Sequence, residues 1–335
     1  MNIAALPRRD APPGRRASLK ELHASIERRL AQLLPMPRDA DDLVSLAMRE
    51  AVLGPGKRVR PLLMLATAQG FGLHSSDVMD AACAVEMVHA ASLLLDDLPC
   101  MDDALERRGR PAMHLRFGED IALLASVALL SQAYGVVAAA EDMAPLLRAR
   151  VVGVLAEAVG TAGLVRGQYR DLREDQANAD EKALTGINDL KTGSLFKVSL
   201  VVPGLAAQAE EALLQRLAAC AGEIGRAFQL RDDLDDGADL PPTSSATPSD
   251  GFGSGEDEGK ATLVALLGRR AARERFDSCL QKAERCLIEI FPNDQTLLQL
   301  VRRIAPEPAP SQLDDCDGWT PASQAAPTLL ARTSA

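Results

Sequence analysis

The chain has 335 residues, of which 37 are basic and 47 acidic, giving a formal net charge of −10. This acidic balance argues against nucleic acid as the main partner, because binding to a phosphate backbone depends on excess lysine and arginine. Apolar residues make up 47% and charged residues 25% of the chain, a composition that excludes disorder throughout. Aromatic residues contribute only 3%, and leucine, alanine and valine dominate, which favours helices over a β-sandwich.

The first 17 residues are rich in proline and arginine, and we expect them to form a disordered N-terminal arm. No apolar stretch follows the arginines of this arm, so it does not resemble a signal peptide. The six cysteines show neither a paired short spacing nor a nearby histidine pair, which argues against a zinc site or a disulfide framework. These observations predict a protein of the reducing cytoplasm.

Helical periodicity recurs along most of the remaining chain. Ser18 and Glu21 have the spacing of a capping box, which predicts a helix from Ser18 to about Leu34. Apolar patterns predict further helices over residues 39–53, 61–69, 77–95, 119–140, 145–159, 183–202, 210–233 and 261–290. No alternating strand run bounded by hairpin turns is present. The predicted fold class is therefore all-α, with long helices packed around one another.

Two later segments are poor in residues that form a core. Residues 237–259 are dense in glycine, proline and serine and predict a mobile loop, and residues 305–335 predict a loose C-terminal tail. We expect residues 18–304 to form a single domain.

Residues 121–140 carry no charge and are long enough to span a membrane, but polar residues interrupt them. We therefore expect a buried core helix there and no transmembrane span.

A first cluster of aspartates follows an apolar helix. Asp96, Asp97 and Asp102 come directly after the apolar residues 81–95. On an ideal helix Asp102 would lie about 120° away from Asp96. Pro99 forbids an ideal helix here, because its ring clashes with a carbonyl of the preceding turn. A break at this point would return Asp102 to Asp96.

A second cluster, Asp232, Asp233, Asp235 and Asp236, ends another apolar helix. Asp232 and Asp236 are four residues apart, so they lie on one helix face. Carboxylates packed this densely repel one another unless cations lie between them. Oxygen ligands with few histidines favour Mg²⁺, which binds through carboxylates, waters and substrate phosphates. Either cluster alone is as readily a solvated helix end, but the two together favour metal sites.

Four groups of basic residues complement the aspartates. The segment GPGKRVRP (54–61) is not a Walker P-loop, because Lys57 is followed by arginine rather than serine or threonine. The other groups are RRGRP (107–111), KTG (191–193) and GKAT (259–262). Taken singly, each is more often a surface charge. Together with two acidic clusters they predict a substrate that carries diphosphate groups.

These motifs resemble those of the trans-isoprenyl (polyprenyl) diphosphate synthases, most closely the bacterial geranylgeranyl diphosphate synthases of carotenoid pathways. The resemblance covers roughly residues 40–270 and includes GPGKRVRP (54–61), VEMVHAASLLLDDLPCMDD (85–103), RRGRP (107–111), GQYRDL (167–172), KTGSLF (191–196), FQLRDDLDD (228–236) and DEGKATLV (257–264). It implies a bundle of long helices around a central apolar cavity, about three Mg²⁺ ions per active site, and a homodimer.

The resemblance also implies an activity and a role for each matched residue. The activity is head-to-tail condensation of isopentenyl diphosphate with dimethylallyl, geranyl or farnesyl diphosphate to give geranylgeranyl diphosphate, by ionisation, condensation and elimination. The residues implied to bind Mg²⁺ are Asp96, Asp97, Asp102, Asp232, Asp233 and Asp236. Those implied to contact the allylic substrate are Arg107, Lys191, Thr192, Gln229 and Lys260. Those implied to bind isopentenyl diphosphate are Lys57, Arg60, His89 and Arg108, with Gln168 and Asp171 lining the same cavity.

Product length is expected to follow from what blocks the cavity below the first cluster. Ala91 and Ser92 lie about one turn before Asp96, and both are small. In this family a bulky residue five positions before the first aspartate stops the product at C15, so Ala91 implies C20. A farnesyl or longer-chain synthase is the alternative, with Ala91 as a mere packing residue. The chain departs from the family at Pro55, usually a glycine, and at Asp235, usually an apolar or small residue.

Rival interpretations explain less of the chain. The segment Glu86-x-x-His89 matches half of the signature of a di-iron helical bundle. The other histidines lack the glutamate three positions before them that the second half requires. A non-catalytic regulatory subunit is expected to have lost an aspartate motif, and both motifs are intact. A terpene cyclase would not need the cations Lys57, Arg60 and Arg108 for a second diphosphate.

Overall fold

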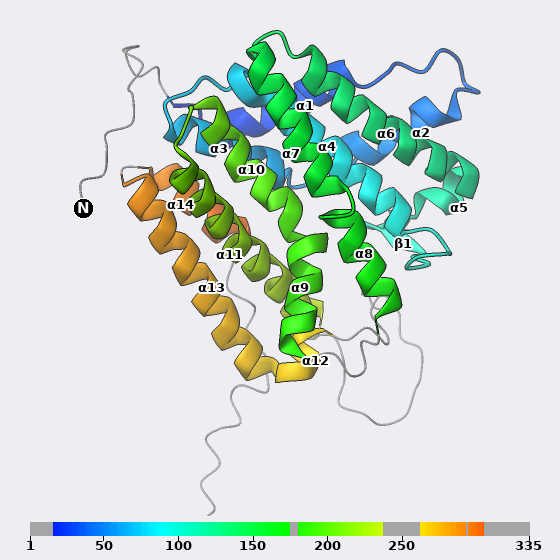
Figure 1. The fold of residues 1–335 in the computed structure, drawn as a ribbon. Coiled ribbons are helices and arrows are strands. Elements are labelled where there is room, and N and C mark those ends of the chain that lie inside the picture. Colours follow the sequence, from blue (N-terminus) through cyan, green and yellow to red (C-terminus); the bar gives the residue numbers. More distant parts are fainter. Residues whose placement is uncertain (1–15, 175–179, 237–261, 293, 305–335) are drawn as a thin grey trace, which may run out of the picture.

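The computed structural model describes residues 16–174, 180–236, 262–292 and 294–304. Within these ranges the chain is almost entirely helical, which confirms the predicted all-α fold (Figure 1). The elements are α1 (Leu19–Leu33), α2 (Leu43–Leu53), α3 (Val59–Gly70), α4 (Ser76–Asp96), β1 (Glu106–Arg107), β2 (Arg110–Pro111), α5 (Met113–Phe117), α6 (Glu119–Ala139), α7 (Pro145–Val159), α8 (Leu164–Arg173), α9 (Glu181–Lys191), α10 (Gly193–Ala206), α11 (Glu211–Asp236), α12 (Leu263–Leu267), α13 (Arg269–Ile290) and α14 (Gln295–Ile304). The predicted loop 237–259, the tail 305–335 and most of the N-terminal arm lie outside the described residues.

Local sequence signals set several helix ends. Ser18 Oγ accepts a hydrogen bond from the backbone of Glu21, and the Glu21 carboxylate accepts one from the Ser18 N–H at 2.7 Å, so the predicted capping box is confirmed. Gly268 divides the predicted helix 261–290 into α12 and α13, because its φ of 80° lies in the left-handed region. The predicted helix 183–202 is also two helices, α9 and α10.

Sequence patterns missed three short helices and a hairpin. The helices α5, α8 and α14 have 5, 10 and 10 residues, too few for a clear periodic pattern. Asp294 caps α14, since its Oδ1 accepts from the backbone N–H groups of Thr296 and Leu297 at 3.0 and 3.2 Å. It also pairs with Arg16 at 3.1 Å, which ties the described end of the N-terminal arm to this helix.

Two hydrophobic cores hold the ends of two helices in place. In the main core α4 is buried on nearly all sides, largely by α3, α6 and α10 (Figure 1). The second core lies between α9, α11, α12 and α13 and consists of Leu184, Ala227, Leu230, Leu234, Leu263, Ala272, Phe276 and Cys279. The first core positions the end of α4, where the first aspartate cluster begins. The second positions the end of α11, which carries the second cluster.

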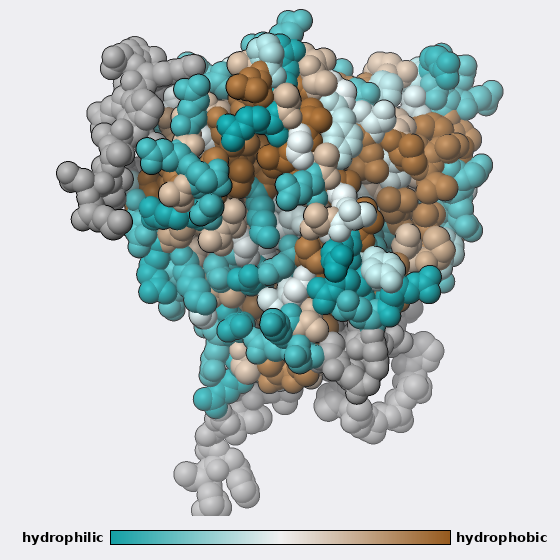
Figure 2. All heavy atoms as spheres, viewed as in Figure 1, coloured by the Kyte–Doolittle hydropathy of each residue, from teal (hydrophilic) through white to brown (hydrophobic). Residues whose placement is uncertain are grey.

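The expectation of a buried core helix over residues 121–140 is wrong in part. One face of α6 packs against α4 and α2, but Leu123, Leu124 and Val127 on the other face are 47%, 52% and 58% exposed. Figure 2 shows hydrophobic side chains gathered where α5 and α6 lie in Figure 1. By length and composition, α4 and α6 are the two described helices that are apolar enough to cross a membrane, a test that core helices of soluble proteins also pass.

Candidate active site

The turn after α4 folds the first aspartate cluster back on itself. The helix ends at Asp96, and the backbone N–H of Asp102 donates to the carbonyl of Asp96 at 2.9 Å. The break predicted at Pro99 is therefore present and returns Asp102 to Asp96. The side chains of Asp97 and Asp102 are only 3% and 9% exposed. Together with Asp96, they form a cluster of three carboxylates that is largely protected from solvent.

This crowding changes the proton affinity of Asp96. Burial raises the pKa of Asp96 to about 6, with the charges of Asp102 and Asp97 acting in the same direction. Lys191 and Arg107 oppose the rise but do not cancel it. The surroundings of Asp96 therefore disfavour its negative charge, and an added cation is favoured there.

The β1–β2 hairpin carries all three arginines of the RRGRP segment. Arg108 and Gly109 form its turn with φ angles of 56° and 75°, a conformation that suits glycine in a two-residue hairpin loop. Arg107 donates from Nε and Nη2 to Asp97 Oδ1 at 2.9 and 2.6 Å. Arg108 donates to the carbonyl of Pro55 at 3.0 Å, which joins the hairpin to the loop before α3.

Lys191, the last residue of α9, reaches the first cluster from another side. Its Nζ lies 2.8 Å from Asp171 Oδ2 and 3.8 Å from Asp102 Oδ2. Burial alone would lower the pKa of this ammonium group, but Asp96, Asp171 and Asp102 outweigh burial and raise it. Lys191 therefore remains charged at neutral pH.

The next residue connects the site to the second cluster. Thr192 donates from Oγ1 to Gln229 Oε1 at 3.0 Å, and Gln229 donates from Nε2 to Asp233 Oδ1 at 2.9 Å. Thr192 lies at the junction where α9 ends and α10 begins, so it reaches α11 while Lys191 reaches the first cluster. The two aspartate clusters are thus parts of one site, linked through two consecutive residues.

Gly167 allows α8 to approach this junction. A Cβ at Gly167 would lie 2.4 Å from the backbone N of Lys191 and 2.8 Å from its Cα, so no other residue fits without a shift of the helices. Gln168, which follows, is 8% exposed, and its side-chain N and O have no hydrogen-bond partner among the residues that the structure describes. Asp171, one turn later, is the partner of Lys191.

Arg231 pairs with two aspartates of the second cluster, a role that no sequence motif indicated. It forms ion pairs with Asp232 and, at 3.4 Å, with Asp235. Burial raises the pKa of Asp232, and the charge of Arg231 opposes the rise. Asp235 is 44% exposed and lies at the edge of the cluster. The side chain of Asp236 and all of Lys260 lie outside the described residues.

The positive charges of nearby arginines act on His89. Burial is the largest cause of a pKa for His89 well below its ordinary value, so the imidazole is neutral at neutral pH. Positive charges add to this effect, and they belong to Arg60, Arg108, Arg107 and Arg58. The structure therefore places this histidine in a cationic setting that suits an anion.

Arg60 links this cationic setting to the second cluster. It is 9% exposed, and its Nε has no hydrogen-bond partner within the described ranges. Burial lowers the pKa of Arg60 to about 10, while the charge of Asp232 raises it. The charge of Lys57 also acts on Asp232. The predicted cations Lys57 and Arg60 therefore border the second cluster.

Arg58, the middle cation of the GPGKRVRP segment, has a structural role instead. It donates to Glu27 at 2.7 Å, Glu86 at 3.1 Å and the carbonyl of Gly54 at 2.7 Å. Because Glu86 is bound to Arg58 and His89 lies among arginines, these two residues do not form half of a di-iron site. In the part of the chain described, no group of three or more His, Cys, Asp or Glu side chains could hold a metal by itself.

A pocket that is open to solvent lies between α2, α4 and the hairpin. Ala90, Leu93 and Leu94 of α4 form an apolar wall, and Arg107 and Arg108 lie at the polar end next to the first cluster. This combination of an apolar wall and cations suits a ligand with a hydrophobic part and an anionic part.

The geometry agrees with the family to which the sequence points. The polyprenyl synthetase family matches residues 41–290. The chain belongs to this family. It is 47% identical to a geranylgeranyl diphosphate synthase of Pantoea ananas, over 80% of this chain and 86% of that one. It is 44% identical to a geranylgeranyl diphosphate synthase of Pseudescherichia vulneris, over 84% and 90%. An FPP/GFPP synthase structure from Zymomonas mobilis has a TM-score of 0.73 at 32% identity and covers 86% of this chain and 96% of that one.

The two small residues before the first cluster occupy different places in this polyprenyl synthetase. Ala91 is fully buried, and its carbonyl accepts a hydrogen bond from Ser126 Oγ of α6 at 2.9 Å. Ser92 is 9% exposed and donates to the carbonyl of His89 at 2.9 Å. A larger side chain at position 91 would therefore have to displace atoms that pack around α4.

We expect Gly167→Ala to lower the turnover of this polyprenyl synthetase by about tenfold or more, because the added methyl group displaces α8 from Lys191. The same overpacking should lower the free energy of unfolding by about 1–3 kcal/mol. Product assays and urea unfolding measure the two effects.

Gly153→Ala is the matched control, because a Cβ at this helical glycine meets nothing within 4 Å. Alanine is the better helix former, so this variant should be at least as stable as the parent. Equal losses of turnover in the two variants would contradict the role assigned to Gly167.

Proposed function

We propose that the chain is a geranylgeranyl diphosphate synthase, a magnesium-dependent prenyltransferase that condenses isopentenyl diphosphate with an allylic diphosphate. The observation that carries this proposal is the linkage of two aspartate clusters through Lys191 and Thr192 at a site bordered by buried arginines. Such a site offers carboxylates to a metal-bound diphosphate and cations to a second diphosphate. The names of the two bacterial relatives support the product.

The aspartate clusters suit Mg²⁺, because carboxylate oxygens are its preferred protein ligands and because the surroundings of Asp96 disfavour an unbalanced negative charge. We assign metal binding to Asp96, Asp97, Asp102, Asp232, Asp233 and Asp236. When bound, Mg²⁺ would neutralise charge on the departing diphosphate. Since the described residues form no closed metal site alone, oxygens of the substrate and water would complete the coordination.

The protein's own cations serve the two diphosphates separately. We assign Arg107, Lys191, Thr192, Gln229 and Lys260 to the allylic diphosphate. The fixed charges in this group stabilise negative charge as the bond between the allylic carbon and oxygen breaks. We assign Lys57, Arg60, His89 and Arg108 to isopentenyl diphosphate, with Gln168 and Asp171 lining the cavity. The neutral His89 contributes a hydrogen bond rather than a charge.

The carbon–carbon bond forms once the allylic diphosphate has ionised. The double bond of isopentenyl diphosphate attacks the allylic carbon, and the proton lost in the last step passes to the released diphosphate. Water has to be kept away from the cation, which it would otherwise quench. The buried apolar residues of α4 and its neighbours provide that dry surrounding.

The proposal is tested by incubating the purified protein with labelled isopentenyl diphosphate, Mg²⁺ and dimethylallyl, geranyl or farnesyl diphosphate in turn. We expect a C20 prenyl diphosphate from the allylic starters, loss of turnover with a chelator, and recovery on addition of Mg²⁺. Asp97→Asn should lower kcat by about a hundredfold or more. A product that stops at C15 would support the farnesyl alternative, and no condensation in any mixture would refute the proposal.

Ala91→Tyr should shift the main product from C20 to C15, because a bulky residue five positions before the first aspartate is the feature that stops the chain in this family and Ala91 is fully buried at that position. Chromatography of the dephosphorylated products measures the chain length. Ala91→Ser is the matched control and should keep C20, since it adds only one atom. Unchanged C20 in a folded Ala91→Tyr enzyme would show that another residue limits the chain.

We also propose that the enzyme is a cytoplasmic homodimer and that the apolar face of α6 is its interface. Exposed hydrophobic side chains gather on and beside this helix, and they are Leu115, Leu123, Leu124, Val127 and Leu146. An apolar patch of this kind on a protein surface is typical of an interaction site. Light scattering after gel filtration should give the mass of a dimer.

Val127→Arg should give a monomer, because the charge would be buried unpaired in the interface. The control is Ile288→Arg on α13, where the replaced residue is likewise exposed, at 46%, but lies far from α6 in the fold (Figure 1). A dimer that survives Val127→Arg would place the interface elsewhere.

A further inference from the structure

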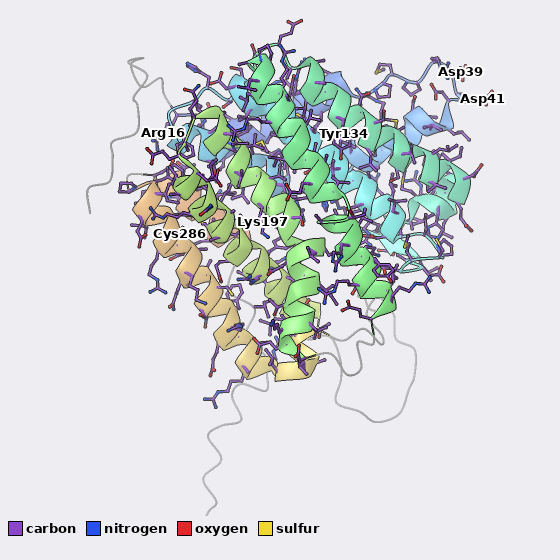
Figure 3. All side chains as sticks on the ribbon, viewed as in Figure 1. Arg16, Asp39, Asp41, Tyr134, Lys197 and Cys286 are labelled. Carbon is purple, nitrogen blue, oxygen red and sulfur yellow. The ribbon has the colours of Figure 1, made fainter. Side chains whose placement is uncertain are left out.

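Two cysteines meet where α11 and α13 pack side by side. Figure 3 labels Cys286 on α13, where that helix runs along α11. Cys220 lies on α11 and is buried, whereas Cys286 is half-buried and accessible from one side. Neither residue belongs to the proposed active site.

Reciprocal contacts place the two sulfur atoms between the helices. Cys220 Sγ lies 3.7 Å from the carbonyl oxygen of Ala283, one turn before Cys286 on α13. Cys286 Sγ lies 3.7 Å from the carbonyl oxygen of Arg216, one turn before Cys220 on α11. A side chain as short as cysteine reaches a backbone carbonyl of another helix only where the two backbones come close. The two cysteines therefore face each other.

Contacts on both sides fix this register. Toward one end of the helix pair, Arg216 Nη2 lies 2.8 Å from Glu289 Oε2. Toward the other end, burial raises the pKa of the Cys279 thiol, and Glu223 lies near enough for its charge to raise this pKa further. The residue numbers rise along α11 as they fall along α13, so the helices are antiparallel and Cys220 lies opposite Cys286. A third cysteine on the same face, Cys279, is two turns away from Cys286.

We propose that Cys220 and Cys286 form a reversible disulfide between α11 and α13 when the protein meets a hydroperoxide. A disulfide needs the two Cα atoms within about 7 Å and the side chains directed at each other. The reciprocal 3.7 Å contacts of the two sulfur atoms with the opposite backbones place the pair within reach of this geometry. Cys279 and Cys286, which are seven residues apart on one helix, would be about 10 Å apart and do not.

The order of reaction follows from the surroundings of the two thiols. The interaction between the two neighbouring thiols lowers the pKa of Cys286 to about 7 and raises the pKa of Cys220. Arg216 lowers the pKa of Cys286 further, while burial and Glu289 oppose the shift. Cys286 is also the more accessible thiol, so it is the first to react.

The chemistry balances in two steps. The Cys286 thiolate attacks one oxygen of the hydroperoxide; an S–O bond forms, the O–O bond breaks, and hydroxide or an alkoxide leaves, which gives a sulfenic acid. The Cys220 sulfur then attacks the Cys286 sulfur; the S–S bond forms, the S–O bond breaks, and the oxygen leaves as water with the Cys220 proton. A dithiol returns two electrons and restores both thiols.

The disulfide would strengthen the support of the second aspartate cluster. It would join positions 66 residues apart, from 220 to 286, and so restrict the unfolded chain. The joined helices also supply most of the second core, which holds the end of α11. Because each thiol already lies against the backbone of the opposite helix in the reduced protein, the oxidised enzyme should keep its turnover at moderate temperature and resist heat better.

The test uses the full-length protein, reduced and then treated with a small excess of hydrogen peroxide. After free thiols are blocked with N-ethylmaleimide, a non-reducing peptide map should contain one cross-linked species that joins the peptides of Cys220 and Cys286. Dithiothreitol should abolish it. The oxidised protein should melt about 5–10 °C above the reduced one. A disulfide to any other cysteine, or no disulfide under these conditions, would overturn the proposal.

Two variants sharpen the result. Cys220→Ala should leave Cys286 as a sulfenic acid that dimedone traps, and its melting temperature should not rise with peroxide. Cys279→Ala is the matched control on the same face of α13, and it should form the cross-link and gain stability as the parent does. Cross-linking that disappears in Cys279→Ala and persists in Cys220→Ala would refute the assigned pair.

Discussion

The ion pairs of Lys191 and the hydrogen bond of Thr192 hold two mutually repelling groups of carboxylates at one site. Lys191 brings a positive charge to the first cluster, and Thr192 reaches the second through the neutral amide of Gln229. The side chains of successive residues in a helix point about 100° apart. Two neighbouring residues at a helix junction can therefore reach two different aspartate clusters. The close approach of α8 at Gly167 keeps this junction in position. The rest of the site is arranged around it.

The two hydrophobic cores explain how the carboxylates stay in place despite their repulsion. The main core fixes α4 up to its last turn, and the smaller core fixes α11 in the same way. Arg107 and Arg231 then each neutralise an aspartate within the cluster that they border. Among the remaining cations, Arg60 and Lys57 act on the second cluster, and Arg108 lies in the hairpin beside the first. Carboxylates and cations therefore alternate around the site, which suits the binding of a metal-bound anion beside a second anion.

Much of this was predictable from strong local signals. The capping box at Ser18 and the break at Pro99 each follow from the chemistry of one or two residues, and the structure contains both. The hairpin at residues 106–111 was not predictable from alternation, because each strand has only two residues. The pairing of Arg58 with Glu86 joins residues that are distant in sequence, so no local pattern reveals it. The roles of the site residues remain proposals that rest on this geometry and on the family.

The exposed face of α6 shows a different limit of sequence analysis. An apolar helix buried in its own chain and one buried against a second chain have the same composition, so periodicity cannot separate them. Only the positions of α2 and α4 reveal which side of α6 is left uncovered. In the second core, by contrast, the buried residues of α11 and α13 recur at regular helical spacings, which sequence analysis can detect. That α11 and α13 pack against each other becomes evident only in the fold.

The most direct measurement is a crystal structure of the protein with Mn²⁺ in place of Mg²⁺ and a non-hydrolysable allylic diphosphate analogue. Anomalous scattering from manganese would locate the ions independently of the protein coordinates. We expect metal peaks next to Asp96 and next to Asp232, all within reach of oxygens of a single diphosphate. Peaks at only one cluster, or a diphosphate bound away from both, would contradict a shared site.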